Sequence, residues 1–348
     1  MLVSDFDFDL PAELIAQTPT DDRESARLLV VDREGHGVRD RRVADLPDLL
    51  RPSDLLVINE TRVFPARLLG HRVPTGGAVE CVLLARLDDE RWDALVHPGQ
   101  KLRVGARVRF EREGRWLDGE VLEHLVYGRR TIRLWGDGEG TVDELVDAIG
   151  HIPLPPYIRR SDHPVDRERY QTVYASVRGS VAAPTAGLHL TEAMLQRCAE
   201  RGIEVARLTL HVGYGTFKPV RVDCVEDHTV DAEPYDVPPE TADAVNRALD
   251  TGRRVVSVGT TTTRALESAA RVGGGRLRAG RGVSDLYLYP GVPLRVVGAL
   301  FTNFHLPRSS LLMLVSALGG RERVLDAYAA AVRRGYRFYS YGDAMLLR

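Results

Sequence analysis

The chain has 348 residues, of which 44% are hydrophobic and 28% are charged, and its formal net charge at pH 7 is −2. This composition is that of a soluble globular protein with room for two domains, and it excludes intrinsic disorder and indiscriminate binding to polyanions, though not a local basic patch. No apolar run approaches the roughly 20 residues of a membrane helix, and the N-terminus MLVSDFDFDL is acidic, so a cytoplasmic protein that binds no membrane is expected.

In the first 150 residues, the pattern of apolar and polar residues changes near residue 62. Before that point we expect a short helix at 10–17, an extended segment at 27–32, and a strand buried on both faces at DLLVIN, residues 54–59. Between 63 and 137, six short alternating segments are separated by Gly, Asp and Pro, which predicts a small β-barrel or β-sandwich. TVDELVDAIG (141–150) predicts a helix, and HIPLPPYI (151–158) predicts a stiff connector.

From residue 151 onward, helical and extended patterns alternate. Helices are expected at 167–175, 191–202, 239–252, 261–272, 309–320 and 321–335, and strands at 203–210, 253–259, 285–290 and 296–304. Such alternation predicts a mostly parallel, helix-covered sheet. The sequence therefore predicts an α/β domain built from residues 1–62 and 151–348, interrupted by an inserted all-β barrel domain at 63–150.

Polar clusters follow four of the expected strands. In an open α/β sheet, ligands collect at the carboxyl ends of the strands, so these clusters should share one edge. The clusters contain Asn59, Glu60 and Arg62; His211, Gly213, Gly215, Thr216 and Lys218; Gly259 with Thr260 to Thr263; and Asn303 with His305.

Each cluster also has a purely structural interpretation. The glycines suit a tight turn, the threonines suit a helix cap, and a lone histidine beside an apolar strand is more often structural. The segment VEDHTVDAE is equally compatible with acid/base chemistry and with a solvated loop; it contains Glu226, Asp227, His228, Asp231 and Glu233.

The segment GSVAAPTAGLHL (179–190) is too apolar for an ordinary surface loop and too rich in helix breakers for a helix. It is either a tight buried connection or a cavity wall pressed against a ligand, with Thr185 offering a hydroxyl and His189 pointing toward the chemistry. Under the second interpretation, Ala186→Leu should abolish ligand binding and leave the fold intact.

Several familiar functional motifs are missing from the sequence. Cys81, Cys198 and Cys224 have neither disulfide-framework nor zinc-ligand spacing, so no metal site is expected. The sequence contains no serine nucleophile elbow, P-loop, HExxH or intact dinucleotide fingerprint. Hydrolase, NTPase and nicotinamide dehydrogenase functions are therefore disfavoured.

The chain resembles a known family over nearly its full length. The strings that carry this resemblance include DLLVINETRVFPARL, GHIPLPPYI, VAAPTAGLHL, TLHVGYGTFKPV, VGTTTTRALESA, TNFHLPRSSLLMLVSA and YRFYSYGDAML. They are similar to those of the S-adenosylmethionine:tRNA ribosyltransferase-isomerases of queuosine biosynthesis, the QueA family. The resemblance implies an α/β domain that carries an inserted β-barrel.

The resemblance also implies a reaction. S-adenosylmethionine would donate its ribosyl portion to the aminomethyl group of 7-aminomethyl-7-deazaguanine at the wobble position of a tRNA, giving epoxyqueuosine and releasing adenine and methionine. The donor would be consumed as a substrate, and no cofactor is implied. Such chemistry needs a base near the ribose 5′ carbon and an acid that helps adenine leave.

The resemblance implies site residues by matching motif positions. The acid and base would belong to a pool of His189, His211, His228 and His305, with Glu226 and Asp227 orienting or replacing them. The methionine carboxylate would lie near Gly259, Thr260, Thr261 and Thr262, with Arg264 as its charge partner. The adenine and ribose would contact Asn59, Thr61, Gly213, Tyr214 and Gly215. Further candidates for binding the substrates are Arg62, Thr185, Gly187, Thr216, Glu233, Asn303 and Asp343.

One position departs from the family pattern. Where many members carry a second histidine after EDH, this chain has Asp231. Either that histidine is dispensable or a carboxylate can do its work.

Basic side chains would hold the tRNA, and the barrel would grip the anticodon stem-loop. The candidates are Arg23, Arg27, Arg62, Arg67, Arg159, Arg160, Arg178 and Lys218. We expect a monomer, although the sequence does not decide the oligomeric state. The alternatives are a non-catalytic RNA-binding protein of the same fold and a methyltransferase, and the latter is disfavoured because no glycine-rich loop follows the first strand.

Overall fold

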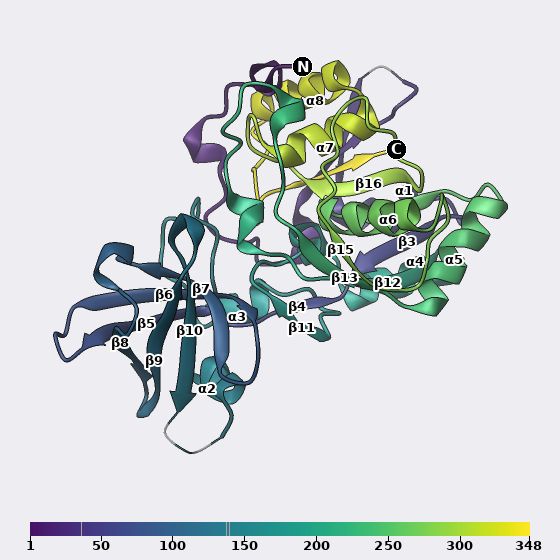
Figure 1. Ribbon diagram of the computed structural model, residues 1–348. Coiled ribbons are helices and arrows are strands. Elements are labelled where there is room, and N and C mark those ends of the chain that lie inside the picture. The colour runs from purple at the N-terminus through teal and green to yellow at the C-terminus, as the bar shows by residue number, and fades with distance from the viewer. Residues whose placement is uncertain (36, 137, 139) are drawn as a thin grey trace.

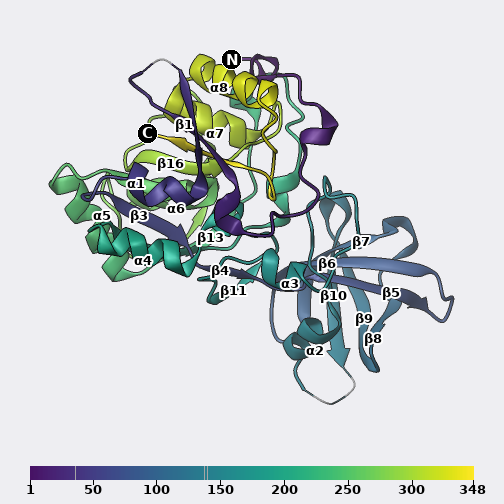
Figure 2. The ribbon, with the colours of Figure 1, turned by 180° about the vertical axis from the view of Figure 1, so that it is seen from behind.

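A nine-stranded sheet forms the larger part of the molecule, and a closed barrel lies beside it (Figure 1). The computed structural model describes residues 1–35, 37–136, 138 and 140–348. The two chain ends lie near each other on the sheet side, away from the barrel (Figures 1 and 2).

The sheet is parallel at its centre. Its strands, in spatial order, are β15 (Gly280–Ser284), β13 (Glu233–Val237), β12 (Glu204–Leu210), β3 (Leu55–Asn59), β14 (Val255–Val258), β16 (Val297–Asn303), β17 (Ala344–Leu347), β1 (Arg27–Val31) and β2 (Val38–Arg42). Strands β12, β3, β14 and β16 run parallel to one another, and β1 runs parallel to β17. The remaining neighbours are antiparallel. The expected α/β class is therefore confirmed, but the sheet is mixed, where a mostly parallel sheet was expected.

Helices cover both faces of this sheet. They are α1 (Leu46–Leu49), α4 (Glu192–Glu200), α5 (Pro239–Asp250), α6 (Thr260–Val272), α7 (Ser310–Gly319) and α8 (Arg321–Arg333). Strand β3 explains the arrangement, because Leu55 and Val57 belong to the core under α5 to α8, whereas Leu56 and Ile58 belong to the core under α1 and α4. A strand buried on both faces must be apolar throughout, as the LLVI run is.

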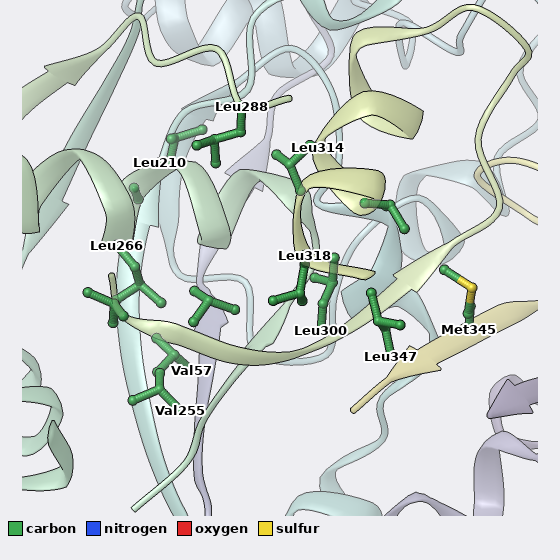
Figure 3. Close-up of a cluster of buried hydrophobic side chains, with 14 of the residues drawn as sticks. Val57, Leu210, Val255, Leu266, Leu288, Leu300, Leu314, Leu318, Met345 and Leu347 are labelled. Carbon is green, nitrogen blue, oxygen red and sulfur yellow. The ribbon is translucent and has the colours of Figure 1, made fainter. Parts of the chain in front are cut away.

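The larger core joins the sheet to α6 and α7. Figure 3 shows Val57 and Val255 of the sheet close to Leu266 of α6, and Leu300 of the sheet close to Leu318 of α7. Because helix α6 is buried along most of its length, its position is determined by packing on both sides. This packing fixes where its N-terminus lies.

The six expected barrel strands all form. They are β5 (Arg67–Val73), β6 (Ala78–Arg86), β7 (Arg91–His97), β8 (Arg107–Arg112), β9 (Arg115–His124) and β10 (Arg129–Gly136), and they close in the order β10-β7-β6-β5-β8-β9. Helix α2 (Val142–Ile149) packs on the barrel core through Leu145 and Val146. It begins with a capping box in which Thr141 Oγ1 accepts from Glu144 N and Glu144 Oε2 accepts from Thr141 N.

A small two-stranded sheet lies near the junction of the two parts. Strand β4 (Thr61–Val63) pairs in parallel with β11 (Val177–Ser180), and Arg67 forms an isolated bridge with His151. The chain therefore enters and leaves the barrel through neighbouring segments.

Three expected elements are wrong or shortened. The segment 285–290 is irregular, and the strand lies before it, at β15. The expected helix at 167–175 is reduced to α3 (Asp166–Arg169), and the one at 10–17 is a 3-10 turn at Ala12–Leu14. Among the described residues, no helix is long and apolar enough to span a bilayer.

Candidate active site

The polar clusters after β3, β12, β14 and β16 lie at one edge of the sheet. These four strands are parallel neighbours, so their carboxyl ends meet at this edge, as the sequence predicts. A cavity of about 550 Å³ opens at this edge beside the ends of β14 and β16, and we call it the first cavity. Its wall includes Gly259, Thr260, Thr261, Asn303 and His305.

Helix α6 presents its N-terminus to the first cavity. Gly259 occupies the N-cap with φ of 89°, a conformation that suits glycine and that leaves no side chain to cap the helix. The hydroxyl of Thr262 donates to the Val258 carbonyl at 2.6 Å, so it serves the local fold rather than a ligand. The Thr261 hydroxyl, in contrast, has no partner, although its oxygen is buried. The helix dipole and the free amides make this end of α6 suitable for an anion.

The stretch 179–190 forms another part of the wall. Residues 182–186 line the first cavity, as the ligand-wall interpretation expects. Gly187 does not line it: a Cβ there would lie 2.3 Å from the Tyr174 hydroxyl oxygen, so this glycine permits packing against Tyr174. Gly179 is equally structural, because a Cβ there would lie 2.6 Å from the His211 ring.

Asn303 and His189 form a hydrogen-bonded pair behind this wall. Asn303 Nδ2 donates to His189 Nε2 and to the Tyr339 carbonyl, both at 3.1 Å. Burial lowers the pKa of His189 to about 4, so its ring is neutral at physiological pH. His189 packs edge-on against Phe301 and is absent from the described cavity lining, so it contacts the site through Asn303.

His305 lies in the wall itself. Its Nε2 is 2.9 Å from Thr302 Oγ1, and its backbone amide donates to the Tyr328 hydroxyl at 3.0 Å. Burial lowers the pKa of His305 to about 3. A ring with this pKa is a neutral hydrogen-bonding group and a weak base.

A second cavity of about 630 Å³ adjoins the first and is more polar. Its lining includes Asp227, His228, Asp231, Glu233 and Arg264. The two cavities share part of their lining, namely Thr216, Lys218, Pro219, Ser310 and Leu311. Ligands in the two cavities would therefore face each other across residues 216–219 and the first turn of α7.

His228 packs against Tyr287 in the lining of the second cavity. Its ring meets Tyr287 edge-on at a centroid distance of 5.1 Å. Partial burial lowers the pKa of His228, and the nearby Asp231 carboxylate opposes that shift. Asp231 itself pairs with Lys218 at 2.6 Å. Asp231, at the position where the family resemblance implies a histidine, therefore lines the cavity and forms an ion pair with a lysine.

Glu233 and Arg264 form a buried ion pair in the lining of the second cavity. Arg264 Nη1 donates to Glu233 Oε2 at 2.6 Å, and the other carboxylate oxygen accepts from Gly213 N at 2.9 Å. Arg264 also donates to the carbonyls of Ser284 and Leu286. Because its donors are engaged and it lines the second cavity, Arg264 is not the expected charge partner of a carboxylate bound at the start of α6.

Several residues predicted to contact the donor, at the ends of β3 and β12 and at the start of β4 (Thr61–Val63), form hydrogen bonds within the protein. Asn59 Nδ2 donates to the Leu210 carbonyl at 2.9 Å, and Asn59 Oδ1 accepts from the amides of Leu210 and Thr61. Thr61 Oγ1 is 2.8 Å from His211 Nδ1. Within the described lining, none of these side chains borders either cavity. They join the strand ends, and burial lowers the pKa of His211.

Other predicted residues are also placed elsewhere. Glu226 is exposed and pairs with the N-terminal ammonium of Met1 at 3.0 Å. Asp343 is buried and accepts from the backbone amides of Arg27 and Arg337, so it anchors the chain. Tyr214 packs against the barrel core, whereas Thr185 and Thr216 do line the first cavity. A Cβ at Gly215 would lie 2.2 Å from an Asp231 carboxylate oxygen, so Gly215 makes room for Asp231.

Most of the predicted tRNA-binding cations bind protein acceptors. The pairs are Arg23 with Leu188 and Glu168 carbonyls, Arg27 with Asp40, Arg67 with Glu80, Arg160 with Asp166, Arg178 with Asp143 and Asp147, and Lys218 with Asp231. Arg62 and Arg159 are exposed, and in the described part of the chain neither guanidinium pairs with a carboxylate. These two arginines are the best placed of the set to meet phosphate.

The cavities include residues that the sequence did not single out. Tyr287 lines the second cavity from the segment interpreted as a strand, and Tyr157, Tyr339 and Ser340 line the first. The Tyr157 hydroxyl lies 2.5 Å from Ser340 Oγ. The string YRFYSYGDAML was a signal for Tyr339 and Ser340, but its role was not apparent without the fold. No cluster of three or more metal-ligating side chains is found among the described residues.

Comparisons with known proteins agree on one family. A family model described as queuosine biosynthesis protein matches residues 3–347. The S-adenosylmethionine:tRNA ribosyltransferase-isomerases of Symbiobacterium thermophilum and Desulfitobacterium hafniense are 51% and 48% identical, and each alignment covers 100% of both chains. A crystal structure of an S-adenosylmethionine tRNA ribosyltransferase from Thermotoga maritima is 34% identical, with a TM-score of 0.56 over 99% of this chain and 100% of that chain.

Proposed function

This chain belongs to the family of queuosine biosynthesis proteins, and we propose that it acts as an S-adenosylmethionine:tRNA ribosyltransferase-isomerase whose two adjoining cavities hold its two substrates. The donor occupies the first cavity, and the modified base of the tRNA occupies the second. The observation that carries this assignment is the N-terminus of α6, with its unpartnered Thr261 hydroxyl, opening into a cavity at the strand ends.

The first cavity suits the donor in size and chemistry. Its volume of about 550 Å³ lies in the range of small-molecule sites. The methionine carboxylate lies against the amides at the start of α6 and the Thr261 hydroxyl. The small side chains of Ala182, Ala183 and Ala186 let the backbone approach the rest of the donor.

The second cavity suits the acceptor base, 7-aminomethyl-7-deazaguanine at the wobble position. A guanine-type base presents an N–H and an amino group on one edge, and carboxylates accept from such donors. Asp227 and Asp231 supply carboxylates in the lining, and Tyr287 supplies an aromatic face. The shared residues 216–219 separate the base from the donor ribose, so the aminomethyl group reaches across them.

His228 is the proton acceptor for the attacking amine. An aminomethyl group is protonated in neutral water, so it must lose a proton before it attacks. Of the four histidines in the sequence pool, His189 and His305 have pKa values of about 4 and 3, and His211 bonds to Thr61 away from the cavities. His228 lines the second cavity, and Asp231 favours its protonated form.

His305 acts as a neutral group in the first cavity. Thr302 fixes one ring nitrogen, which leaves the other available for a hydrogen bond to the donor. An approaching sulfonium cation disfavours protonation of this ring even further. His305 therefore orients the donor or the departing adenine through hydrogen bonding.

Electrostatic contacts and the barrel hold the tRNA backbone. Arg62 lies beside the passage into the barrel, and Arg159 follows the connector that leaves it. We retain residues 63–150 as an inserted domain that contacts the anticodon stem-loop, while residues 1–62 and 151–348 carry the chemistry. Phosphate contacts made this way weaken steeply as salt is added.

One assay tests the function directly. The protein is incubated with S-adenosylmethionine and a tRNA that carries the 7-aminomethyl-7-deazaguanine base, and the small products are separated. Adenine and methionine together are expected. S-adenosylhomocysteine would instead identify a methyltransferase, and no product with bound tRNA would identify a binding protein. In single turnover, His228→Ala should slow adenine release strongly, whereas His124→Ala, at a histidine bonded to the Leu102 carbonyl in the barrel, should not.

A further inference from the structure

Two buried polar atoms in the wall of the first cavity have no partner. They are Asn303 Oδ1 and Thr261 Oγ1, on residues that are 2% and 7% exposed. Buried polar atoms are nearly always hydrogen-bonded in folded proteins. Two such atoms on one cavity wall therefore point to a ligand that supplies both partners.

The orientation of the Asn303 amide is determined by its neighbours. The Tyr339 carbonyl, 3.1 Å from the amide nitrogen, can only accept a hydrogen bond. If the amide were turned over, two oxygen atoms would face each other. The nitrogen must therefore lie toward Tyr339, and Oδ1 is left as an acceptor without a donor.

The same bond determines the tautomer of His189. The second proton of the Asn303 amide points to His189 Nε2 at 3.1 Å, so this nitrogen must carry a lone pair. The proton of the neutral ring is then on Nδ1. His189 thus holds Asn303 from behind, and it acts on a ligand only through that side chain.

We infer that this wall recognises the α-amino acid end of the donor as a zwitterion, with the carboxylate on the α6 N-terminus and the Thr261 hydroxyl and the ammonium on Asn303 Oδ1. His189 is the positioning residue that keeps Asn303 in this orientation. The inference rests on the proposed function for the identity of the ligand. The wall offers donors where a carboxylate needs them and an acceptor where an ammonium needs one.

The first experiment measures discrimination at the α-carbon. Binding of S-adenosylmethionine is compared with binding of its des-amino analogue, which keeps the carboxylate but carries only hydrogen in place of the ammonium. The unaltered protein should bind the analogue about tenfold or more weakly, as expected for loss of a charge-assisted hydrogen bond. Asn303→Leu should bring the ratio of the two affinities close to one, because it weakens the binding of S-adenosylmethionine.

A matched variant controls for the loss of an asparagine. Asn246 Nδ2 donates to the Leu277 carbonyl, and Asn246 Oδ1 accepts from the Leu277 amide. Asn246 lies outside the described linings of both cavities. Asn246→Leu should leave the discrimination ratio unchanged. Equal binding of donor and analogue by the unaltered protein would overturn the inference, and so would a ratio that survives Asn303→Leu.

The second experiment tests the positioning role of His189. His189→Phe keeps a flat ring beside Phe301 but removes the acceptor, so KM for the donor should rise several-fold while kcat and the pH profile of kcat stay close to those of the unaltered protein. His189→Gln restores an acceptor and should recover most of the loss. A collapse of kcat with unchanged KM would show that His189 acts on the reacting atoms. Thermal unfolding checks that each variant is folded. If His189→Phe does not fold, the inference is tested by the ratio of donor affinity to des-amino analogue affinity in the unaltered protein and in Asn303→Leu.

Failure of the function and failure of the inference give different results. If the unaltered protein releases no adenine from donor and tRNA, the proposed function is wrong. The comparison of donor binding with binding of the des-amino analogue involves no turnover, so it still tests the recognition of the ammonium. If adenine is released but the ratio is one, only the inference fails.

Discussion

Two adjacent residues of the 179–190 stretch, Ala186 and Gly187, should respond oppositely to enlargement. Ala186 is 2% exposed, and its Cβ would lie 3.5 Å from a Cβ placed on Gly259, so its methyl group faces the start of α6. Ala186→Leu adds three carbon atoms at this point, where the donor carboxylate is proposed to bind. Gly187→Ala adds one carbon atom on the other side, 2.3 Å from the Tyr174 hydroxyl oxygen.

The expected magnitudes follow from this geometry. Both changes overpack a dense region, which typically costs about 1–3 kcal/mol of unfolding free energy. Only Ala186→Leu also covers the α6 amides, whose interaction with an anion is worth up to ~2 kcal/mol. Because the leucine also takes up space in the cavity, the affinity for S-adenosylmethionine should fall by at least about tenfold. The fold of this variant should persist, but with reduced stability.

Calorimetric titration of the donor and thermal unfolding of both variants measure these effects together. Ala186→Leu should lose donor affinity and some stability, whereas Gly187→Ala should lose stability and keep its affinity. If Ala186→Leu binds the donor normally, the stretch is only a tight buried connection. If Gly187→Ala alone loses affinity, the side of the stretch that faces the ligand has been assigned wrongly.

Three further predictions concern buried charge, pH and tRNA. Glu233→Gln should lower the unfolding free energy measured by chemical denaturation by about 3–5 kcal/mol, because it leaves its buried arginine partner without a countercharge, and a change below 1 kcal/mol would contradict this. Burial lowers the pKa of His189 to about 4 and the pKa of His305 to about 3. Below pH 6.5 the unfolded chain therefore binds more protons than the folded chain does. The unfolding free energy should fall as the pH falls toward 4, by up to about 1.4 kcal/mol per pH unit for each ring. In His305→Asn, the unfolding free energy should depend less steeply on pH than in the unaltered protein. An unchanged slope would contradict the conclusion that the His305 ring is buried in its neutral form. Arg62→Ala and Arg159→Ala should each reduce the slope of log affinity for tRNA against log salt by about one, and slopes that stay the same in both variants would remove these arginines from the phosphate contacts.

Hydrophobic periodicity was enough to predict the regular elements. The six barrel strands alternate apolar and polar residues, and the LLVI run of β3 is apolar throughout because both faces are covered. Such patterns are local, since each residue's burial depends on its place in a repeat of two or 3.6. The rule for the carboxyl ends of parallel strands then predicted the correct edge for the cavity.

The errors lie where this periodicity is lost or misleading. DLYLYP alternates leucine and tyrosine like a strand, yet it is irregular, and Tyr287 lines the second cavity. The true strand, β15, is a polar edge strand that pairs with β13 and has little apolar pattern. Edge strands are specified by pairing with a distant segment, which the local sequence does not reveal.

The sequence by itself determined the fold class, the family and the edge of the sheet where polar residues meet. Only the tertiary structure decided which of those residues face a ligand. Asn59 is bonded to Leu210, 151 residues away, and does not line the described cavity, whereas Asn303, whose amide nitrogen is held by Tyr339 and His189, does line it. The physical reason is that a side chain in a loop takes its orientation from hydrogen-bond partners far along the chain, and those partners become neighbours only when the sheet has formed.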